Sequence, residues 1–154
     1  MKVRIFTDGA CEPKNPGGFA VAAFVAIDSE TKITIAKHAE IVASGQNATN
    51  NLAEVAAIAK ALSWVESRPE ISDAEICSDS QLAVNLVNRF WRPDPSKRYY
   101  PPLVEALSLF DRLRSKGVKV EVRWISRDFN IEADSLAVHL ALCAAKEIAA
   151  RERG

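Results

Sequence analysis

The chain is organised around one stretch near its start, Arg4-Ile5-Phe6-Thr7-Asp8-Gly9-Ala10-Cys11-Glu12-Pro13-Lys14-Asn15-Pro16-Gly17-Gly18. Its first residues favour a β-strand, because Ile5, Phe6 and Thr7 all have high strand propensity. Asp8-Gly9 is a common turn pair, and prolines and glycines punctuate the residues that follow it. We therefore expect a strand that ends at Asp8 and presents this carboxylate to a shaped loop. Asp8-Gly9 alone could be a turn and nothing more, so its meaning depends on where other carboxylates fall.

The composition is that of an ordinary globular chain. Its 154 residues fit one domain over residues 1–154, with 48% hydrophobic and 26% charged residues. The 20 basic and 20 acidic side chains cancel, so any surface for a polyanion must be local. The sequence shows neither a signal-like start nor an apolar run of membrane length, so we expect no membrane association and a cytoplasmic location.

The cysteines do not suggest a disulfide framework or a thiolate metal site. Cys11, Cys77 and Cys143 are odd in number and have no CxxC spacing. This usage fits a reducing compartment. We interpret all three as small buried or loop residues.

Hydrophobic periodicity predicts five strands and four helices. Residues 18–27 are almost continuously apolar, which is typical of a strand covered on both faces. Residues 32–42 partly alternate, which predicts a half-exposed strand with a bulge near Lys37. The other predicted strands are residues 3–7, 71–78 and 119–125. The predicted helices are residues 52–67, 80–90, 102–116 and 130 to nearly the end, the last with Leu136, Ala137, Leu140, Ala144 and Ile148 on one face.

This order of elements, β-β-β-α-β-α-α-β-α, predicts an α/β fold. Three strands joined by short turns, followed by strands separated by helices, imply a mixed five-stranded sheet with helices on both faces. The first three strands would be antiparallel and the last two parallel. Right-handed crossovers would place the fourth strand beside the first.

Four carboxylates fall at related places in this plan. Asp8 and Asp79 end the first and fourth strands, whereas Glu54 and Asp134 lie in the first turns of the first and last helices. Each has a structural alternative: Glu54 completes a capping box if Asn51 is the N-cap, Asp79 caps its own helix, and Asp134 suits the positive end of a helix dipole. Taken together, these separate structural roles are a weaker explanation than a shared site. The first and fourth strands are predicted neighbours, and the carboxyl ends of neighbouring parallel strands face one crevice.

The same acids stand in short motifs spread over most of the chain. These are Phe6-Thr7-Asp8-Gly9 with Asn15-Pro16-Gly17-Gly18, Thr49-Asn50-Asn51 with Glu54, Ser78-Asp79-Ser80-Gln81, and Asn130-Ile131-Glu132-Ala133-Asp134 with Leu136-Ala137. In this order they resemble the type 1 ribonuclease H (ribonuclease HI) family. The resemblance implies a ribonuclease H-like fold and a metal-dependent endonuclease that hydrolyses the RNA strand of RNA–DNA hybrids. It further implies that Asp8, Glu54, Asp79 and Asp134 are catalytic and hold two Mg²⁺ ions, for which Mn²⁺ can substitute.

The chemistry of the reaction explains why such residues are needed. Phosphodiester hydrolysis requires an aligned water and stabilisation of the leaving 3′ oxygen, and two divalent ions about 4 Å apart supply both. Mg²⁺ prefers oxygen ligands, so carboxylates suit it better than His or Cys. Four crowded acids repel one another without a metal, which argues against four independent capping roles.

Recognition of RNA in a hybrid depends on sugar hydroxyls, because an A-like duplex exposes 2′-OH groups across its shallow minor groove. Side-chain amides both donate and accept hydrogen bonds. The suitable amides are those of Asn15, Asn50, Asn51 and Gln81. The resemblance places them, with Gly9 and Cys11, along the minor groove and Thr49 near a phosphate of the DNA strand. The alternative roles are loop and cap chemistry for the asparagines and an exposed helix position for Gln81.

Two departures from the family pattern stand out. Residues 89–100 replace an extra basic helix of many relatives, and their prolines make a full helix there improbable. Arg92, Lys97 and Arg98, with neighbouring aromatic residues, could contact the DNA strand. Alternatively, the segment is a solvated loop whose aromatic side chains pack on the core.

The second departure is a missing histidine before the last acid. The loop reads Ser126-Arg127-Asp128-Phe129, so Arg127 and Asp128 are the nearest candidates for an auxiliary role. His139 follows Asp134 by five residues, roughly 140° around a helix, and should not face the acids. His38 lies on an outer strand, so we expect both histidines to be structural or exposed.

Together these observations predict a monomeric ribonuclease H acting on RNA–DNA hybrids. Two alternatives remain: a nuclease of the same fold that also acts on double-stranded RNA, and a non-catalytic hybrid-binding module. Retention of all four acids argues against the module, and the amide set favours a hybrid over a DNA duplex.

Overall fold

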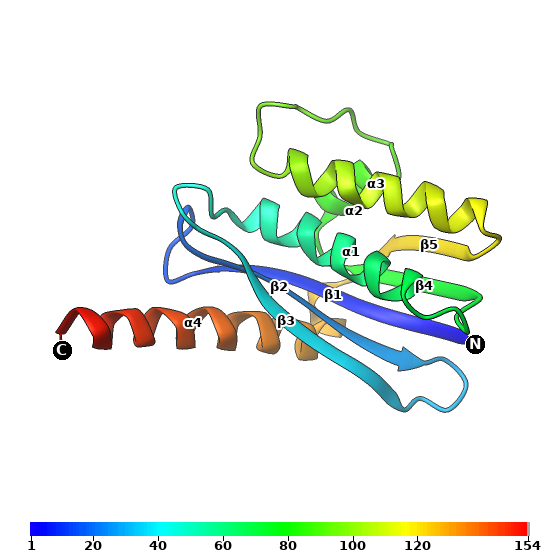
Figure 1. Ribbon diagram of the computed structural model, residues 1–154, viewed down its shortest axis with the longest axis horizontal. Helices are drawn as coiled ribbons and strands as arrows, with labels where there is room; N and C mark the ends of the chain where they lie inside the picture. Colours follow the sequence, from blue (N-terminus) through cyan, green and yellow to red (C-terminus); the bar gives the residue numbers. More distant parts are fainter. Residues whose placement is uncertain (154) are drawn as a thin grey trace.

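The computed structural model describes residues 1–153, in which helices cover both faces of one mixed sheet (Figure 1). The strands are β1 (Lys2–Glu12), β2 (Gly17–Asp28), β3 (Thr34–Gly45), β4 (Asp73–Ser78) and β5 (Lys119–Trp124). The helices are α1 (Asn50–Glu66), α2 (Gln81–Val87), α3 (Tyr100–Ser115) and α4 (Ile131–Arg153), preceded by a 3₁₀ turn at Arg127–Phe129. The element order and the α/β class are those predicted from the sequence.

The five strands lie in the order β3-β2-β1-β4-β5. β1 pairs antiparallel with β2 and parallel with β4, whereas β5 is parallel to β4. Val3 lies opposite Ala74, which confirms the predicted insertion of the fourth strand beside the first. Two segments distant in sequence therefore end side by side.

α1, α2 and α3 lie on one face of the sheet and α4 on the other (Figure 1). β2 is apolar throughout because it is covered from both sides. Its Phe24 and Ala26 pack in the main core with residues of α1, whereas Val21 and Ala23 pack against Ala137 of α4 and its neighbours. No helix of residues 1–153 combines the length and apolar character needed to cross a bilayer.

β1 does not end at Asp8-Gly9, and that part of the prediction is wrong. The parallel pairing with β4 stops at Thr7, which lies opposite Ser78. The antiparallel pairing with β2 continues through Asp8, opposite Ala23, as far as Glu12. Asp8 thus follows the last residue paired with β4 while its other edge stays hydrogen-bonded, which holds this carboxylate on a strand and not on a loop.

β3 is bulged at Ile35, close to the predicted place near Lys37, although Lys37 itself pairs regularly with Val25. Ile35 and Val42 are each an extra residue in β3, and the register also shifts between Gly17 and Phe19 of β2. The extra residue turns each side chain inward: Ile35 packs against the main core and Val42 against buried alanines of α1.

The helix starts exclude two of the capping alternatives. Thr49 is the N-cap of α1, and its Oγ1 accepts a hydrogen bond from the backbone N–H of Leu52 at 3.1 Å. Glu54 therefore lies in the second turn and is not part of a capping box with Asn51. The N-cap of α2 is Ser80, not Asp79.

The buried face of α4 differs in part from the predicted one. Ala133, Ala137 and Ala141 are fully buried, whereas Ile148 is 41% exposed. The reason is geometric, because the C-terminal half of α4 runs past the sheet (Figure 1). The three cysteines are all free, as predicted, but only Cys11 and Cys77 are buried and Cys143 lies exposed on α4.

Candidate active site

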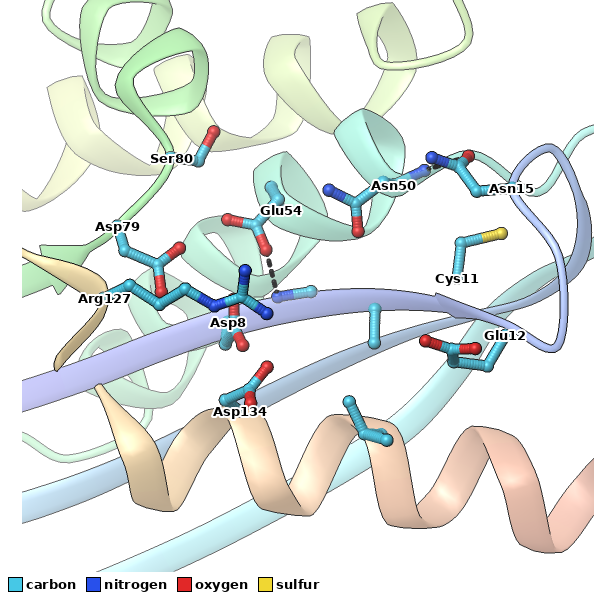
Figure 2. A pocket seen from close by; sticks show the side chains of 13 residues that line it. Asp8, Cys11, Glu12, Asn15, Asn50, Glu54, Asp79, Ser80, Arg127 and Asp134 are labelled. Carbon is cyan, nitrogen blue, oxygen red and sulfur yellow. Dashed lines mark hydrogen bonds between the residues drawn. The ribbon is translucent and has the colours of Figure 1, made fainter.

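The end of the β1–β4 pairing is where the acids gather. Asp8 follows Thr7 in β1, and Asp79 follows Ser78, the last residue of β4. Glu54 reaches the same point from α1 above the sheet (Figure 2). One carboxylate oxygen from each of these three residues lies within 4.8 Å of the others. Three of the four predicted acids therefore form one tight cluster.

Gly9 makes this cluster possible through its lack of a side chain. A Cβ on Gly9 would lie 2.3 Å from the carbonyl carbon of Ala53 and 2.3 Å from the backbone nitrogen of Glu54. α1 therefore crosses β1 in direct backbone contact. At this distance the N–H of Gly9 donates to Glu54 Oε1 at 2.6 Å, which fixes the carboxylate over the strand (Figure 2).

The cluster is electrostatically unfavourable without a cation. Asp8 and Glu54 are each only 4% exposed. Burial raises the pKa of both carboxyl groups, and the surrounding acids raise the pKa of Asp8 further. Glu54 Oε2 is buried and has no hydrogen-bond partner. A hard divalent cation with oxygen ligands would satisfy both the charge and this orphaned oxygen, so the donor set fits Mg²⁺ or Mn²⁺.

Asp134 approaches from the opposite face of the sheet. It lies in the first turn of α4, as predicted, and points toward Asp8 (Figure 2). It is close enough for its carboxylate to raise the pKa of Asp8. Asp134 stands outside the three-oxygen cluster but lines the same cavity, so the structure brings all four predicted acids around one space.

That cavity has a volume of about 420 Å³ and extends from the acids along β1. Five of the other predicted site residues also line it. They are Gly9, Cys11, Asn15, Asn50 and Arg127. Asn15 and Asn50 are tied together, since the backbone N–H of Asn50 donates to Asn15 Oδ1 at 3.0 Å. The cavity thus holds the four acids at one end and the amides of Asn15 and Asn50, with the carboxylate of Glu12, at the other (Figure 2).

Seven predicted residues lie outside this cavity: Arg92, Lys97 and Arg98 in the segment between α2 and α3, and four others. Asn51 and Gln81 are exposed near it, and the hydroxyl of Thr49 serves as the cap of α1. Asp128 lines a separate small apolar hollow with Phe129. The structure therefore does not bring Asp128 to the acids, although Arg127 beside it does reach them.

The segment between α2 and α3 forms no regular helix, as its prolines predicted. Some of its aromatic residues pack on the core and others remain exposed. Tyr99 is buried, and its hydroxyl accepts a hydrogen bond from the N–H of Asp94, whereas Phe90 and Trp91 are exposed. Lys97 and Arg98 line a groove of about 640 Å³ against β3 and the start of α1. Arg92 is exposed and outside this groove.

The histidines lie away from the acids. His139 is exposed on α4 with its Nε2 3.6 Å from Cys143 Sγ. The ring of His38 on β3 lies 2.8 Å from Glu40. Neither lines the cavity of the acids.

Sequence reasoning missed several residues at the site. Glu12, Ser80 and Val138 line the cavity. Asn130 is 1% exposed and donates from Nδ2 to Thr7 O at 2.8 Å and to Asp79 Oδ2 at 3.2 Å. Asn130 opens the motif that ends at Asp134, but nothing in that motif indicated its partners, because a bond across 123 residues has no local pattern.

Comparisons with known proteins agree with this geometry. The sequence model of the RNase H family matches residues 1–141. The chain is 25% identical to the N-terminal RNase H domain of a Mycobacterium tuberculosis protein solved as a fusion with maltose-binding protein, with 96% of this chain and 98% of that chain covered and a TM-score of 0.80. RNase H1 from the halophilic archaeon Halobacterium salinarum is 24% identical, with coverage of 92% and 100% and a TM-score of 0.72.

A further similar structure was solved with a nucleic acid. LC11-RNase H1, isolated from compost, was crystallised in complex with an RNA/DNA hybrid. It is 24% identical, with 94% of this chain and 99% of that chain covered and a TM-score of 0.74.

The sheet order and the acids at the β1–β4 junction define a nuclease with the ribonuclease H fold. The chain belongs to the RNase H family, and it is a ribonuclease H enzyme.

Proposed function

We propose that this protein hydrolyses the RNA strand of RNA–DNA hybrids with two divalent ions held by Asp8, Glu54, Asp79 and Asp134. One observation carries the proposal: the oxygens of Asp8, Glu54 and Asp79 lie within 4.8 Å of one another, and one buried oxygen of Glu54 has no partner. Such a cluster costs stability unless a cation compensates its charge. Bound divalent ions would supply an activated water and charge stabilisation at the leaving oxygen.

The protein's own groups fix the geometry of this site. Asp8 lies between Glu54, Asp79 and Asp134 and is the residue that faces all of the others. The N–H of Gly9 orients Glu54, and the indole N–H of Trp124 donates to the backbone oxygen of Asp79 at 3.1 Å. Because these bonds come from rigid strands, the carboxylates are ordered before substrate arrives.

The polar end of the cavity supports recognition of RNA. Asn15 Oδ1 is engaged by the N–H of Asn50, so the Asn15 amide N–H₂ remains available as a donor. Asn50 offers its whole side-chain amide to the same space. The hydroxyl of Thr49 accepts a bond within α1 and can still donate its proton to a phosphate. Asn51 and Gln81 would join from the exposed rim, and Gly9 and Cys11 would line the floor.

A cleavage assay tests the function directly. End-labelled RNA–DNA, RNA–RNA and DNA–DNA duplexes are incubated with Mg²⁺, Mn²⁺ or EDTA. We expect the RNA of the hybrid to be cut only with a divalent ion, and expect Asp8→Asn to abolish the cutting. Glu121→Gln, which removes an exposed acid of β5, is the matched control and should cut normally.

The same assay separates the alternatives. Equal cleavage of RNA–RNA would show a broader nuclease. Binding of the hybrid without cleavage under every metal condition would show a non-catalytic module and overturn the proposal.

A further inference from the structure

Asn130 lies at the junction of three elements that carry acids. It immediately precedes α4 and is 1% exposed. Its Nδ2 donates to the carbonyl oxygen of Thr7, beside Asp8, and to the carboxylate of Asp79. Its backbone oxygen accepts a bond from the N–H of Asp134 at 3.1 Å. One residue therefore touches Asp79 and the peptide units of the other two acids.

The chemistry of these partners fixes the orientation of the Asn130 amide. The carbonyl oxygen of Thr7 and the Oδ2 atom of Asp79 both accept hydrogen bonds from Nδ2, so the N–H₂ group faces both. Oδ1 is turned away from them and is buried without a partner. An asparagine before a helix ordinarily uses this oxygen to cap the free N–H groups of the first turn. Asn130 leaves it unpaired, which costs stability and shows that packing or capping alone does not explain the residue.

We propose that Asn130 is a positioning residue that sets the place of Asp79 relative to Asp8 and Asp134. Its two N–H bonds hold the Asp79 carboxylate at a fixed offset from the Asp8 peptide, and its backbone oxygen sets the first turn that carries Asp134. The inference rests on the proposed metal-dependent function, because it concerns the geometry that those acids offer to a cation. Residues behind metal ligands of this kind commonly alter metal affinity or turnover when replaced.

Asn88 provides a matched control for a purely structural role. It is a half-buried asparagine at the end of α2, and its Nδ2, like that of Asn130, donates to a backbone oxygen, that of Val122 at 2.8 Å. Asn88 lies outside the cavity of the acids. Asn130→Ala and Asn88→Ala thus both remove a side-chain amide that donates to a backbone oxygen, one at the site and one away from it.

The first experiment measures Mn²⁺ binding by calorimetry, together with kcat and KM for the hybrid. We expect Asn130→Ala to weaken Mn²⁺ binding or lower kcat by about 10- to 100-fold, with KM little changed. Asn88→Ala should leave metal affinity and kcat within about twofold of the wild type. Asn130→Asp keeps the shape but replaces the donor by an acceptor, so it should lose kcat at least as strongly. Wild-type metal affinity and kcat in either Asn130 variant would overturn the inference.

The second experiment needs no cleavage. Urea midpoints in EDTA are compared for the wild type, Asn130→Ala, Asp79→Ala and the double variant. If the amide is bonded to Asp79, Asn130→Ala should shift the midpoint less in the Asp79→Ala background. Additive shifts would overturn the inference even if every variant binds metal. This cycle and the Mn²⁺ titration stay informative if the wild type cuts no hybrid, so a failure of the proposed function is recognised separately.

Discussion

At the scale of single residues, environment gives common side chains unusual properties. Glu54 would be an ordinary helix glutamate on a surface, but burial raises its pKa to about 7, even though the hydrogen bond from the N–H of Gly9 acts to lower it. The pKa of Asp8 is also raised, first by burial and then by its acidic neighbours. Both groups are therefore held in a state that favours either a proton or a cation.

Replacing one acid separates catalysis from folding. Asp8→Asn or Asp79→Asn should reduce cleavage at least about 1,000-fold, equivalent to about 4 kcal/mol, because a ligand is lost. Both variants should fold, and their stability in EDTA at neutral pH should equal or exceed that of the wild type, since a repulsive charge is removed. Single-turnover cleavage and urea denaturation measure the two effects. Asp111→Asn, at an exposed position in α3, is the control, and near-normal turnover in either site variant would exclude the metal mechanism.

Arg127 is the one basic side chain lining the cavity of the acids, among the residues the structure describes. Arg127→Ala should lower kcat about tenfold and change KM less, because a cation near the scissile phosphate stabilises charge that develops during reaction. His38→Gln and His139→Gln should leave activity unchanged. The pH profile of single-turnover cleavage should show no step near the unperturbed histidine pKa of about 6.5. Loss of activity in a folded His139→Gln variant would contradict this assignment.

At the scale of elements, the segment between α2 and α3 decides how much of the backbone of a hybrid is held. Arg92, Lys97 and Arg98 form no ion pair with any residue in the described 1–153 range. Replacing all three with Gln should weaken hybrid binding and flatten the plot of log K against log salt by about one unit for each phosphate that is no longer neutralised.

A second triple variant controls for net charge. Lys32, Lys116 and Lys119 lie at the opposite end of the sheet, near the start of β1 and β5. Their replacement with Gln removes the same charge and should leave the salt slope unchanged. An equal salt slope for hybrid binding in both triple variants would show that the segment between α2 and α3 does not contact the phosphate backbone of the hybrid.

The sequence was sufficient for the elements and their order because apolar periodicity and crossover handedness are local or general properties. The position of Asp8 on a continuous strand was not predictable, since it depends on β2 pairing beyond the end of β4. The role of Gly9 was mistaken for turn chemistry because the contact with α1 comes from a distant part of the chain. The acids were found through their motifs, whereas Asn130 was missed because its partners become neighbours only in the folded sheet.

At the scale of the whole molecule, the acids link stability to pH. Their folded pKa values are raised, so the unfolded chain releases protons first as pH rises. Their contribution is complete below the unfolded carboxyl pKa of about 4 and is lost as pH passes through the folded value. Glu66 has the opposite effect on the pH dependence of stability. Its pairing with Arg112 lowers its pKa to about 2, so its contribution to the stability of the fold is lost only in acid.

We therefore expect the free energy of unfolding in EDTA to fall by roughly 2 kcal/mol between about pH 5 and pH 8. Mg²⁺ at 100 times its dissociation constant should restore about 2.7 kcal/mol at the upper pH. Urea denaturation across this range, with and without Mg²⁺, measures both effects. Asp8→Asn should flatten the fall and reduce the gain from Mg²⁺, and a wild-type stability that increases with pH in EDTA would contradict the raised pKa values.

The hydrogen bond from Asn130 to Thr7 joins residues 123 positions apart. A ribosome adds Thr7 of β1 before the other four strands, whereas it adds Asn130 and Asp134 only after all five. Since chains are made at about 5–20 residues per second, roughly 6–25 s separate the addition of Thr7 from that of Asn130, and the cluster of acids stays incomplete throughout. A chain released before α4 is made lacks both Asp134 and the amide of Asn130 that donates to Asp79. We therefore expect a chain that ends before α4 to leave RNA uncut.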